Sequence, residues 1–287
     1  MIRIDARAKI NLSLDILGKR QDNYHDVMMI MQSVELSDVL TFREQEKEAG
    51  IQVISNIPGL PSAERNLAYK AAALVMETFK LDKGLYIDLT KRIPIAAGLA
   101  GGSTDAAAVL VALNEMWNLG LKAPDLCALG EQIGSDVPFC IQGGTMLAKG
   151  RGEILEKLST MPECFVILAK PQASVSTAWA YQNFKADNVE EWPDTDAVIA
   201  ALKNGDLEGI CKHLCNVLES VTIPAHNEIA HLKRLMCKHG ALASLMSGSG
   251  PTVFGLVDDE EKAEYIVEKL SDIDNVQVIL TKTVSEN

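Results

Sequence analysis

The sequence of 287 residues has little positive charge, few aromatic residues and no long hydrophobic run. Lys and Arg total 27 against 39 Asp and Glu, which gives a formal net charge of −12 at pH 7. This acidic balance argues against general nucleic-acid binding, which needs a basic surface. It does not exclude an anionic small substrate, because a few local hydrogen-bond donors can override the net field.

No apolar run approaches the roughly 18–20 residues needed to cross a bilayer. The N-terminus alternates polar and apolar residues and carries Asp5 and Asp15, whereas a signal peptide would start basic and continue apolar. We therefore expect a cytoplasmic protein with neither a membrane nor a nucleic acid as partner. We expect the scattered cysteines to be reduced, mostly buried thiols. They are Cys127, Cys140, Cys164, Cys211, Cys215 and Cys237.

The hydrophobic periodicity indicates mixed helices and strands. Even-numbered positions from 2 to 16 are all apolar, which predicts a long strand with a bend near Ala6–Ala8. Lys9 and Asn11 share its polar face, for which solvent exposure is the common outcome. Further strands are predicted at 34–42, 52–55, 85–90, 145–148, 165–169, 252–257 and 276–281. Helices are predicted at 66–79, 105–117, 124–133, 177–184, 194–203, 208–218, 227–239 and 260–270. This non-alternating order favours an α+β fold, which we divide into domains 1–155 and 156–287.

A glycine-rich segment at 98–105, Gly-Leu-Ala-Gly-Gly-Ser-Thr-Asp, follows a predicted strand and precedes a predicted helix. Glycines allow a ligand to approach the backbone amides, and Ser103, Thr104 or Asp105 can cap the helix. The start of a helix offers free N–H groups and a positive dipole end, so the segment suits a phosphate. A tight turn is the structural alternative. No Gly-Lys-Ser/Thr sequence follows, so any phosphate-binding lysine must come from elsewhere.

Three segments resemble the motifs of the GHMP kinase superfamily (galactose, homoserine, mevalonate and phosphomevalonate kinases). Residues 8–14 resemble its N-terminal motif, 94–104 its phosphate-binding motif, and 244–254 its C-terminal glycine-rich motif. The three occur in the family order and span almost the whole chain. The resemblance implies a two-domain GHMP kinase-like fold. Its N-terminal half would be ribosomal-protein-S5-like and its C-terminal half ferredoxin-like, with the active site in the cleft between them.

Finer features resemble one family within this superfamily, the kinases of 4-diphosphocytidyl-2-C-methyl-D-erythritol. They are Ala-Lys-Ile-Asn-Leu at 8–12, Tyr24-His25, Gly-Ser-Asp-Val-Pro-Phe at 134–139 and Gly-Arg-Gly-Glu at 150–153. The resemblance implies transfer of the ATP γ-phosphate to the 2-hydroxyl of that substrate, in the non-mevalonate isoprenoid precursor pathway. The alternatives are another superfamily kinase acting on a mevalonate-like or homoserine-like substrate, and a catalytically silent paralogue that binds nucleotide.

Phosphoryl transfer needs positioning, charge stabilisation and an acceptor for the hydroxyl proton. The resemblance implies that Asp136 is the catalytic base and that Lys9 lies beside it, holding the reacting hydroxyl and stabilising developing charge. From the sequence alone, a turn or capping role for Asp136 is the alternative. Mg²⁺ is expected with the ATP phosphates, with the hydroxyls of Ser103 or Thr104 as candidate ligands.

The remaining site residues also follow from the resemblance. The ATP-binding residues would be Asn66, Pro94, Ile95, Ala96, Ala97, Gly98, Leu99, Ala100, Gly101, Gly102, Ser103, Thr104, Gly248 and Ser249. The substrate-binding residues would be Asn11, Tyr24, His25, Asp136, Thr177 and Tyr181.

For some of these residues the sequence leaves alternatives open. In the family, a histidine and an aromatic from the second domain sandwich the cytosine, which points to His25 and Tyr181. Tyr181 could instead pack in the core, and His25 could lie on the surface. Asn66 could cap its helix. We expect a monomer or a homodimer.

Overall fold

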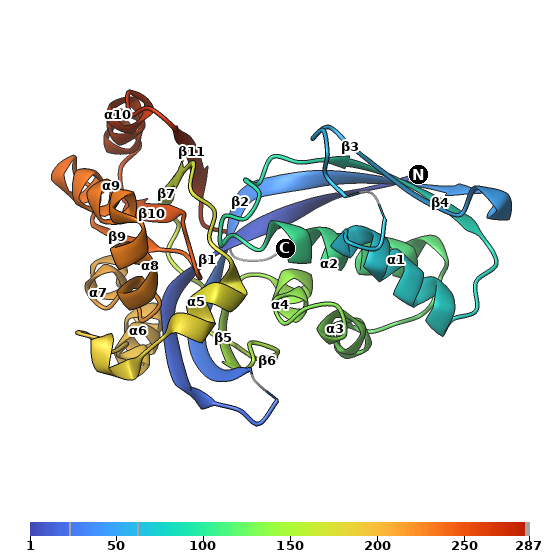
Figure 1. Cartoon of the computed structure of the whole chain (residues 1–287), viewed down its shortest axis with the longest axis horizontal. Coiled ribbons are helices and arrows are strands. Elements are labelled where there is room, and N and C mark those ends of the chain that lie inside the picture. Colours follow the sequence, from blue (N-terminus) through green and yellow to red (C-terminus); the bar gives the residue numbers. More distant parts are fainter. Residues whose placement is uncertain (23, 62, 285–287) are drawn as a thin grey trace.

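The computed structural model describes residues 1–22, 24–61 and 63–284, and it contains two β-sheets with helices packed against them (Figure 1). Within these residues the first sheet has seven strands in the order β3-β4-β2-β1-β8, with β5 paired to β2 and β6 to β5. Its strands are β1 (Ile2–Lys19), β2 (His25–Gln45), β3 (Ile51–Ser55), β4 (Gly84–Thr90), β5 (Thr145–Gly150), β6 (Ile154–Lys157) and β8 (Cys215–Asn216).

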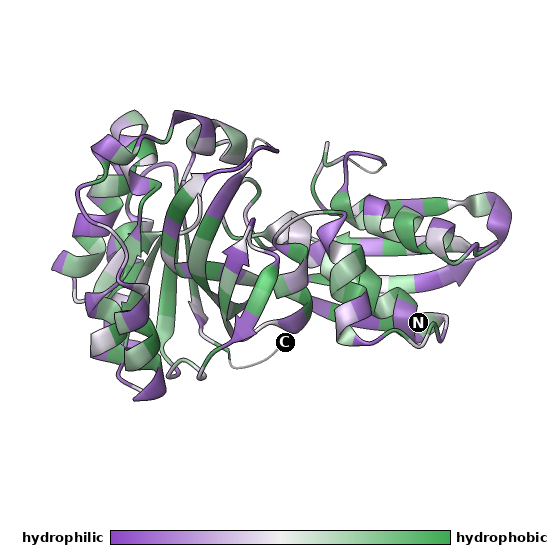
Figure 2. Ribbon diagram, turned by 90° about the horizontal axis from the view of Figure 1, so that it is seen from below, coloured by the Kyte–Doolittle hydropathy of each residue, from purple (hydrophilic) through white to green (hydrophobic). Residues whose placement is uncertain are grey.

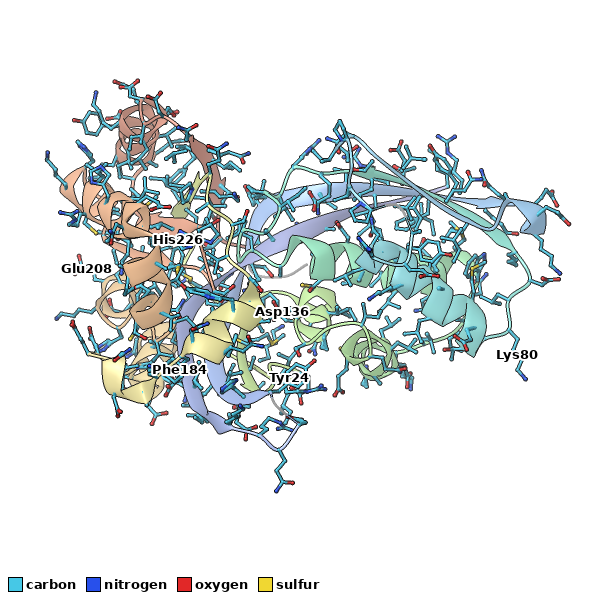
Figure 3. All side chains as sticks on the ribbon, in the orientation of Figure 1. Tyr24, Lys80, Asp136, Phe184, Glu208 and His226 are labelled. Carbon is cyan, nitrogen blue, oxygen red and sulfur yellow. The ribbon has the colours of Figure 1, made fainter. Side chains whose placement is uncertain are left out.

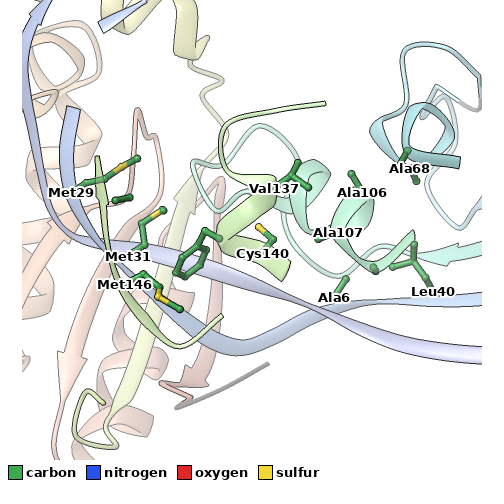
Figure 4. Packing of buried hydrophobic residues seen from close by; sticks show 14 of the residues in the cluster. Ala6, Met29, Met31, Leu40, Ala68, Ala106, Ala107, Val137, Cys140 and Met146 are labelled. Carbon is green, nitrogen blue, oxygen red and sulfur yellow. The ribbon is translucent and has the colours of Figure 1, made fainter. Parts of the chain in front are cut away.

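Helices from the N-terminal half cover one face of this sheet (Figure 1). They are α1 (Leu67–Thr78), α2 (Gly101–Met116), α3 (Ala123–Glu131) and α4 (Val137–Gln142). Helix α2 is rich in alanine, and Ala106 and Ala107 are buried against the sheet near Ala6 and Leu40 (Figure 4). Small side chains let the helix axis lie close to the strands, which carries the start of α2 to the middle of the molecule.

The second sheet is antiparallel and has the order β11-β7-β10-β9. Its strands are β7 (Phe165–Pro171), β9 (Ala243–Met246), β10 (Val253–Val257) and β11 (Val276–Lys282). The surrounding helices are α5 (Thr177–Asn183), α6 (Thr195–Lys203), α7 (Leu207–Lys212), α8 (Glu219–Ala225), α9 (Asn227–Lys238) and α10 (Glu260–Ser271). All five residues of β10 are buried, and Figure 2 shows hydrophobic residues on strands in the interior of the molecule. Short 3-10 turns lie at Lys47–Ala49 and Ala186–Asn188.

The two halves of the chain share structure at their junction. Strand β8 comes from the C-terminal half but pairs in parallel with β1, where Ser13 faces Cys215 and Leu14 faces Asn216. Strand β6 crosses the predicted division at residues 155 and 156, and it belongs to the first sheet. The mixed α and β content agrees with the α+β prediction, whereas the domain boundary stays a prediction.

Several local predictions can be compared with the structure. The bend expected near Ala6–Ala8 is confirmed by a register shift between Arg7 and Lys9. The helix predicted at 208–218 is wrong beyond Lys212, because Cys215 and Asn216 form β8 instead. Pairing with β1 outweighs a helical pattern that continues in the sequence, since tertiary contacts override local propensity. The sequence also missed α4, α8 and β6.

All six cysteines are free; Cys140, Cys164 and Cys215 are buried, whereas Cys237 is exposed. In the described residues no helix is long and apolar enough to cross a membrane.

Candidate active site

A cavity of about 750 Å³ lies where the two halves of the chain meet, and all three segments singled out in the sequence line it. Segment 8–14 contributes Lys9 and Asn11, segment 94–104 contributes most of its backbone, and segment 244–254 contributes a loop. Figure 3 shows Asp136 in this central region. Residues far apart in sequence therefore line one cavity, in agreement with the cleft that the resemblance implies.

Lys9 is a buried cation that lines the cavity, with 4% of its surface exposed. Its Nζ donates to Asn11 Oδ1 at 2.6 Å and to the carbonyl oxygen of Gly98 at 3.1 Å. Asn11 is fully buried, so the polar face of β1 is not exposed to solvent here. The solvent exposure that is common for such a strand face is therefore wrong for Lys9 and Asn11, because α2 and the loop around Gly98 cover both residues.

Asp136 lies directly before α4 and its side chain makes no capping hydrogen bond, which contradicts the capping alternative. Its Oδ2 is 3.9 Å from Lys9 Nζ. The side chain is 31% exposed, so solvent or a ligand can reach the carboxylate from the cavity. The structure therefore brings Lys9 and Asp136 together as an ion pair that is open on one side.

The glycine-rich segment has an unusual backbone. Ala96, Gly98 and Ala100 all have positive φ, at 52°, 74° and 60°. Positive φ is uncommon outside glycine, and alternating conformations of this kind turn successive amides toward one concave surface that suits an anion. Most of the segment lines the cavity. Leu99 is buried in the core and Thr104 donates to the Arg7 carbonyl oxygen at 2.6 Å, so these two side chains point away from it.

Helix α2 begins at Gly101, with Ala100 in the capping position, and no side chain caps it. The predicted caps Ser103, Thr104 and Asp105 are therefore wrong, because they lie inside the first turns of the helix. A Cβ on Gly101 would be 3.1 Å from Ile93 Cγ2. A side chain at position 101 would crowd Ile93, and the first N–H groups of α2, which have no helical partner, stay available at the cavity.

The loop at 247–250 packs directly on the glycine-rich segment. Ser247 Oγ donates to the carbonyl oxygen of Gly98 at 3.0 Å. A Cβ on Gly98 would collide with the Ser247 carbonyl oxygen, and a Cβ on Gly248 would lie 3.4 Å from Lys9 Nζ. Ser249 Oγ is 3.1 Å from Thr177 Oγ1 at the start of α5. Both loops thus approach Lys9 through backbone alone.

Sequence reasoning missed the residues that hold this second loop. Asn216 is 3% exposed, and its Nδ2 donates at 2.8 Å to the carbonyl oxygens of both Met246 and Gly248. Thr222 donates to the Ser249 carbonyl oxygen at 3.2 Å. Asn216 falls within the incorrect helix prediction at 208–218, which hid its role.

A buried ionic cluster beneath the glycine-rich segment was also missed. Lys91 Nζ donates to Asp38 Oδ2, to Asp105 Oδ2 at 2.8 Å and to the Gly101 carbonyl oxygen at 3.2 Å. An ammonium has three N–H donors, so those of Lys91 are used within the protein. Burial lowers the pKa of Lys91, but Asp105 and Asp38 outweigh burial and raise it overall. Lys91 therefore anchors the start of α2 instead of offering a donor to a ligand.

Asn66 caps α1, as one of the sequence alternatives has it. Its Oδ1 accepts from the Ala68 backbone N at 2.9 Å, and its Nδ2 donates to the Pro61 carbonyl oxygen at 2.7 Å. Asn66 also lines the cavity. Its side chain fixes the loop before α1 in place, and contact with a nucleotide stays a prediction.

Three aromatic side chains lie on the same cavity. The ring centroids of His25 and Tyr181 are 5.4 Å apart with an interplanar angle of 33°. This is the spacing of rings in direct contact, so the two rings pack against each other here, and their predicted binding of a cytosine stays a prediction. Tyr24 is 56% exposed and offers an open ring face. Burial, with Lys19 nearby, lowers the pKa of His25 and favours its neutral form.

Comparisons with known proteins agree with this architecture. The family described as "GHMP kinases N terminal domain" matches residues 66–144, and "GHMP kinases C terminal" matches 198–274. A relative in Geobacillus thermodenitrificans, a 4-diphosphocytidyl-2-C-methyl-D-erythritol kinase, is 49% identical over 92% of this chain and 91% of its own. A kinase of the same description in Bacillus cytotoxicus is 51% identical over 92% of this chain and 90% of its own.

Solved structures show the same fold. The crystal structure of a 4-(cytidine 5'-diphospho)-2C-methyl-D-erythritol kinase has a TM-score of 0.83 and 30% identity, covering 99% of this chain and 100% of the other. A homoserine kinase from Cytophaga hutchinsonii has a TM-score of 0.75 at 21% identity, over 99% of this chain and 95% of its own. This more distant likeness extends to the fold alone.

Proposed function

The chain belongs to the GHMP kinases and, within them, to the family of 4-diphosphocytidyl-2-C-methyl-D-erythritol kinases, and we propose that Lys9, Asp136 and the two glycine loops carry out its phosphoryl transfer. It is an ATP-dependent small-molecule kinase that phosphorylates the 2-hydroxyl of 4-diphosphocytidyl-2-C-methyl-D-erythritol for isoprenoid precursor synthesis. The observation that carries the mechanism is the open ion pair of Lys9 and Asp136, beside two backbone loops suited to phosphate.

Asp136 accepts the proton of the reacting hydroxyl. The hydroxyl approaches the carboxylate from the cavity, and as its oxygen bonds to the γ-phosphorus, its proton passes to an Asp136 oxygen while ADP leaves. The 3.9 Å between Lys9 Nζ and Asp136 Oδ2 is too long for a hydrogen bond, so both groups remain able to bind the same hydroxyl. With Asp136 accepting its proton and Lys9 stabilising its charge, the hydroxyl oxygen attacks the γ-phosphorus more readily.

Lys9 stabilises the charge that develops on the transferred group. Two of its three N–H donors are used by Asn11 Oδ1 and the Gly98 carbonyl oxygen. These bonds fix the ammonium in place and leave one donor for the reacting oxygens. A preorganised donor of this kind requires no rearrangement at the moment of reaction, which is why it lowers the barrier.

The two glycine loops supply the seat for the phosphates of ATP. The N-terminus of α2 presents free N–H groups and the positive end of the helix dipole. The loop at 247–250 lies against the glycine-rich segment, so Lys9 is close to both loops. Backbone donors bind phosphate without adding charge, so they are compatible with an acidic protein.

The hard oxygen donors of the cavity fit Mg²⁺. Ser103 lines it, whereas the Thr104 hydroxyl is used by Arg7, so Ser103 is the better of the two candidates. Asp105 also lines the cavity and keeps one buried oxygen, Oδ1, without a hydrogen-bond partner. Mg²⁺ takes few protein ligands and completes its shell with phosphates and water. When bound, it would neutralise charge on the β- and γ-phosphate oxygens.

The cytidine end of the substrate would lie against the aromatic side chains. Tyr24 offers an exposed ring face for stacking, and the neutral ring of His25 can donate or accept a hydrogen bond at the base edge. Asn11 would contact the polyol part of the substrate. Thr177, which also lines the cavity, would contact the substrate from the start of α5. We expect a monomer or a homodimer, and we place the enzyme in the cytoplasm.

The test is ADP release with four acceptors: 4-diphosphocytidyl-2-C-methyl-D-erythritol, mevalonate, homoserine and galactose. We expect turnover with the cytidylylated acceptor alone. Turnover on mevalonate or homoserine instead would assign another superfamily substrate. ATP binding without turnover on any acceptor would identify a silent nucleotide-binding paralogue.

A further inference from the structure

An arginine in the turn between β5 and β6 lies beside the most exposed aromatic of the cavity. Arg151 Cζ is 5.3 Å from the centroid of the Tyr24 ring, within the roughly 6 Å range of a cation–π contact. Both residues line the cavity. We propose that Arg151 is a positioning residue that holds the Tyr24 ring in place as the platform on which the cytosine stacks. This inference rests on the proposed function.

The guanidinium of Arg151 is fixed by two carboxylates. Its Nη2 donates to Glu131 Oε1 at 2.7 Å, at the end of α3, and its Nε lies 3.8 Å from Glu153 Oε1 in the same turn. The side chain is 26% exposed. A planar guanidinium can pair with carboxylates along its edge and stack on an aromatic ring with its face. The contacts with Glu131 and Glu153 along the edge of the guanidinium therefore fix how its planar face is turned toward the Tyr24 ring.

The backbone of the turn is equally constrained. Gly150 and Gly152 flank Arg151 with φ of 70° and 114°. The Arg151 amide donates to Glu153 Oε2 at 2.6 Å. A Cβ on Gly152 would lie 2.7 Å from Met29 Cε of β2, so this turn sits tightly on the strand that follows Tyr24. The backbone of the Gly-Arg-Gly-Glu turn thus fixes the position from which the Arg151 side chain extends.

Tyr24 itself is held through its backbone. Its N donates to Asp22 Oδ1 at 3.1 Å, and its carbonyl oxygen accepts from the Arg20 backbone N at 2.9 Å. These bonds fix the chain and leave the ring free to rotate about its side-chain torsions. An exposed ring loses that freedom when a ligand stacks on it, and a ring that is already held loses less. Arg151 would therefore lower the entropy lost on cytosine binding.

A direct role of Arg151 on the substrate diphosphate is the competing explanation. Glu131 and Glu153 already balance the charge of Arg151, so little net attraction remains for a phosphate. A positioning role acts through Tyr24, whereas a diphosphate contact does not. The two explanations therefore differ in whether the effect of Arg151 disappears once the Tyr24 ring is removed.

The experiment is a double-mutant cycle on the full-length enzyme. We expect Arg151→Met, which keeps an aliphatic stem and loses the cation, to raise KM for the cytidylylated substrate about tenfold. That factor corresponds to about 1.4 kcal/mol. The kcat and the KM for ATP should change less than about twofold. Arg151→Lys keeps a cation for the ring and should recover part of the loss. In a Tyr24→Ala background, Arg151→Met should add less than about twofold.

Lys83→Ala is the matched control. Lys83 Nζ lies 5.7 Å from the Trp117 ring centroid and pairs with Glu44 at 2.8 Å, away from the cavity-lining residues. Its removal should leave every kinetic constant within about twofold. An equal rise in KM in both Tyr24 backgrounds would overturn the proposal, as would an unchanged KM in Arg151→Met.

Calorimetric titration with CDP separates this inference from the proposed function. Weaker CDP binding by Arg151→Met than by wild type, with ATP binding unchanged, would support the platform whatever acceptor the enzyme phosphorylates. Equal CDP affinity in the two proteins would overturn it. Failure of the wild-type enzyme to phosphorylate the cytidylylated acceptor would overturn the proposed function instead.

Discussion

At the residue scale, the central feature is a buried lysine beside a half-open aspartate. Burying an ammonium is unfavourable unless it is paired and hydrogen-bonded. Lys9 meets that condition through Asn11, the Gly98 carbonyl oxygen and Asp136. Asn11 and Gly98 use two of the three N–H donors of Lys9, so one donor remains for a ligand in the cavity. The arrangement suits a group that must act on a bound substrate without moving.

We predict that Asp136→Asn and Lys9→Ala each lower kcat by at least ~10²-fold, the usual scale for a positioned acid–base group. Asparagine cannot take the hydroxyl proton, and alanine removes the charge that stabilises the transferred group. Steady-state ADP release under saturating ATP measures both. The surface pair Lys47 and Asp82, at 2.7 Å, supplies the controls Lys47→Ala and Asp82→Asn, which should be fully active. Near-wild-type kcat in either cavity variant would remove that residue from the mechanism.

The second feature at this scale is the buried cluster of one lysine and two aspartates. Lys91, Asp38 and Asp105 are each less than about a tenth exposed. Burial raises the pKa of Asp105 well above its usual value, against the opposing effect of Lys91. An acid with a raised folded pKa stabilises the fold at low pH, and this contribution is lost as the pH rises toward the folded pKa.

We therefore predict that Asp105→Asn stabilises the protein relative to wild type by an amount that grows as the pH rises above 3.8, the ordinary value for aspartate. Asparagine keeps an oxygen that can accept from Lys91 and removes one buried negative charge. Melting temperatures at several pH values from about 5 to 8 measure this difference. The exposed residue Asp187 gives the control Asp187→Asn. A difference in melting temperature that stays constant or shrinks with pH would contradict the prediction.

At the element scale, the active site depends on two glycine loops that touch through their backbones. Gly98 has φ of 74° and no room for a Cβ beside the Ser247 carbonyl oxygen. The loops come from the two halves of the chain, so their contact fixes the distance between the N-terminus of α2 and the second loop. A side chain at this point would push the phosphate seat apart.

We predict that Gly98→Ala raises KM for ATP at least about tenfold or prevents stable folding, because both backbone strain and a steric collision result. Gly120 is the matched control, since it has φ of 70° with nothing within 4 Å of a Cβ. Gly120→Ala therefore carries the strain alone and should lower only the melting temperature. Kinetics of ATP dependence and thermal unfolding distinguish the two effects. Equal behaviour of both variants would show that the loop contact is unimportant.

Local periodicity predicted most individual elements, because it depends on neighbouring residues. The alternation in β1 and its bend could be read directly, and the start of α1 carries a recognisable cap in Asn66. The position of β8 could not be predicted, since Cys215 and Asn216 form a strand only by pairing with β1. Helix α2 begins at Gly101, four residues before the predicted start, and Gly101 lies close to Ile93, a contact between segments that the local pattern does not contain.

The site shows the same division. Lys9, Asn11 and Asp136 could be named from motifs, and the structure places them together. The supporting residues Asn216 and Lys91 could not, because each acts on a backbone distant in sequence. Their bonds are recognised only when the chain is folded.

At the scale of the whole molecule, the two halves are joined so that neither makes the cavity alone. Strand β8 of the C-terminal half completes the first sheet, and Gln32 of β2 donates to the Val284 carbonyl oxygen near the C-terminal end. The cavity-lining residues of the two halves therefore meet at one place in the molecule. Under the proposed mechanism, this geometry determines which hydroxyl of a bound substrate lies between Lys9 and Asp136.

The most direct measurement is phosphorus NMR of the product formed by the wild-type enzyme from ATP, Mg²⁺ and 4-diphosphocytidyl-2-C-methyl-D-erythritol. We predict one new phosphomonoester signal on the 2-position of the erythritol, formed in equal amount to ADP, and its loss with Asp136→Asn. Phosphate on another hydroxyl, or free phosphate released without a phosphorylated product, would contradict the placement of the reacting oxygen between Lys9 and Asp136.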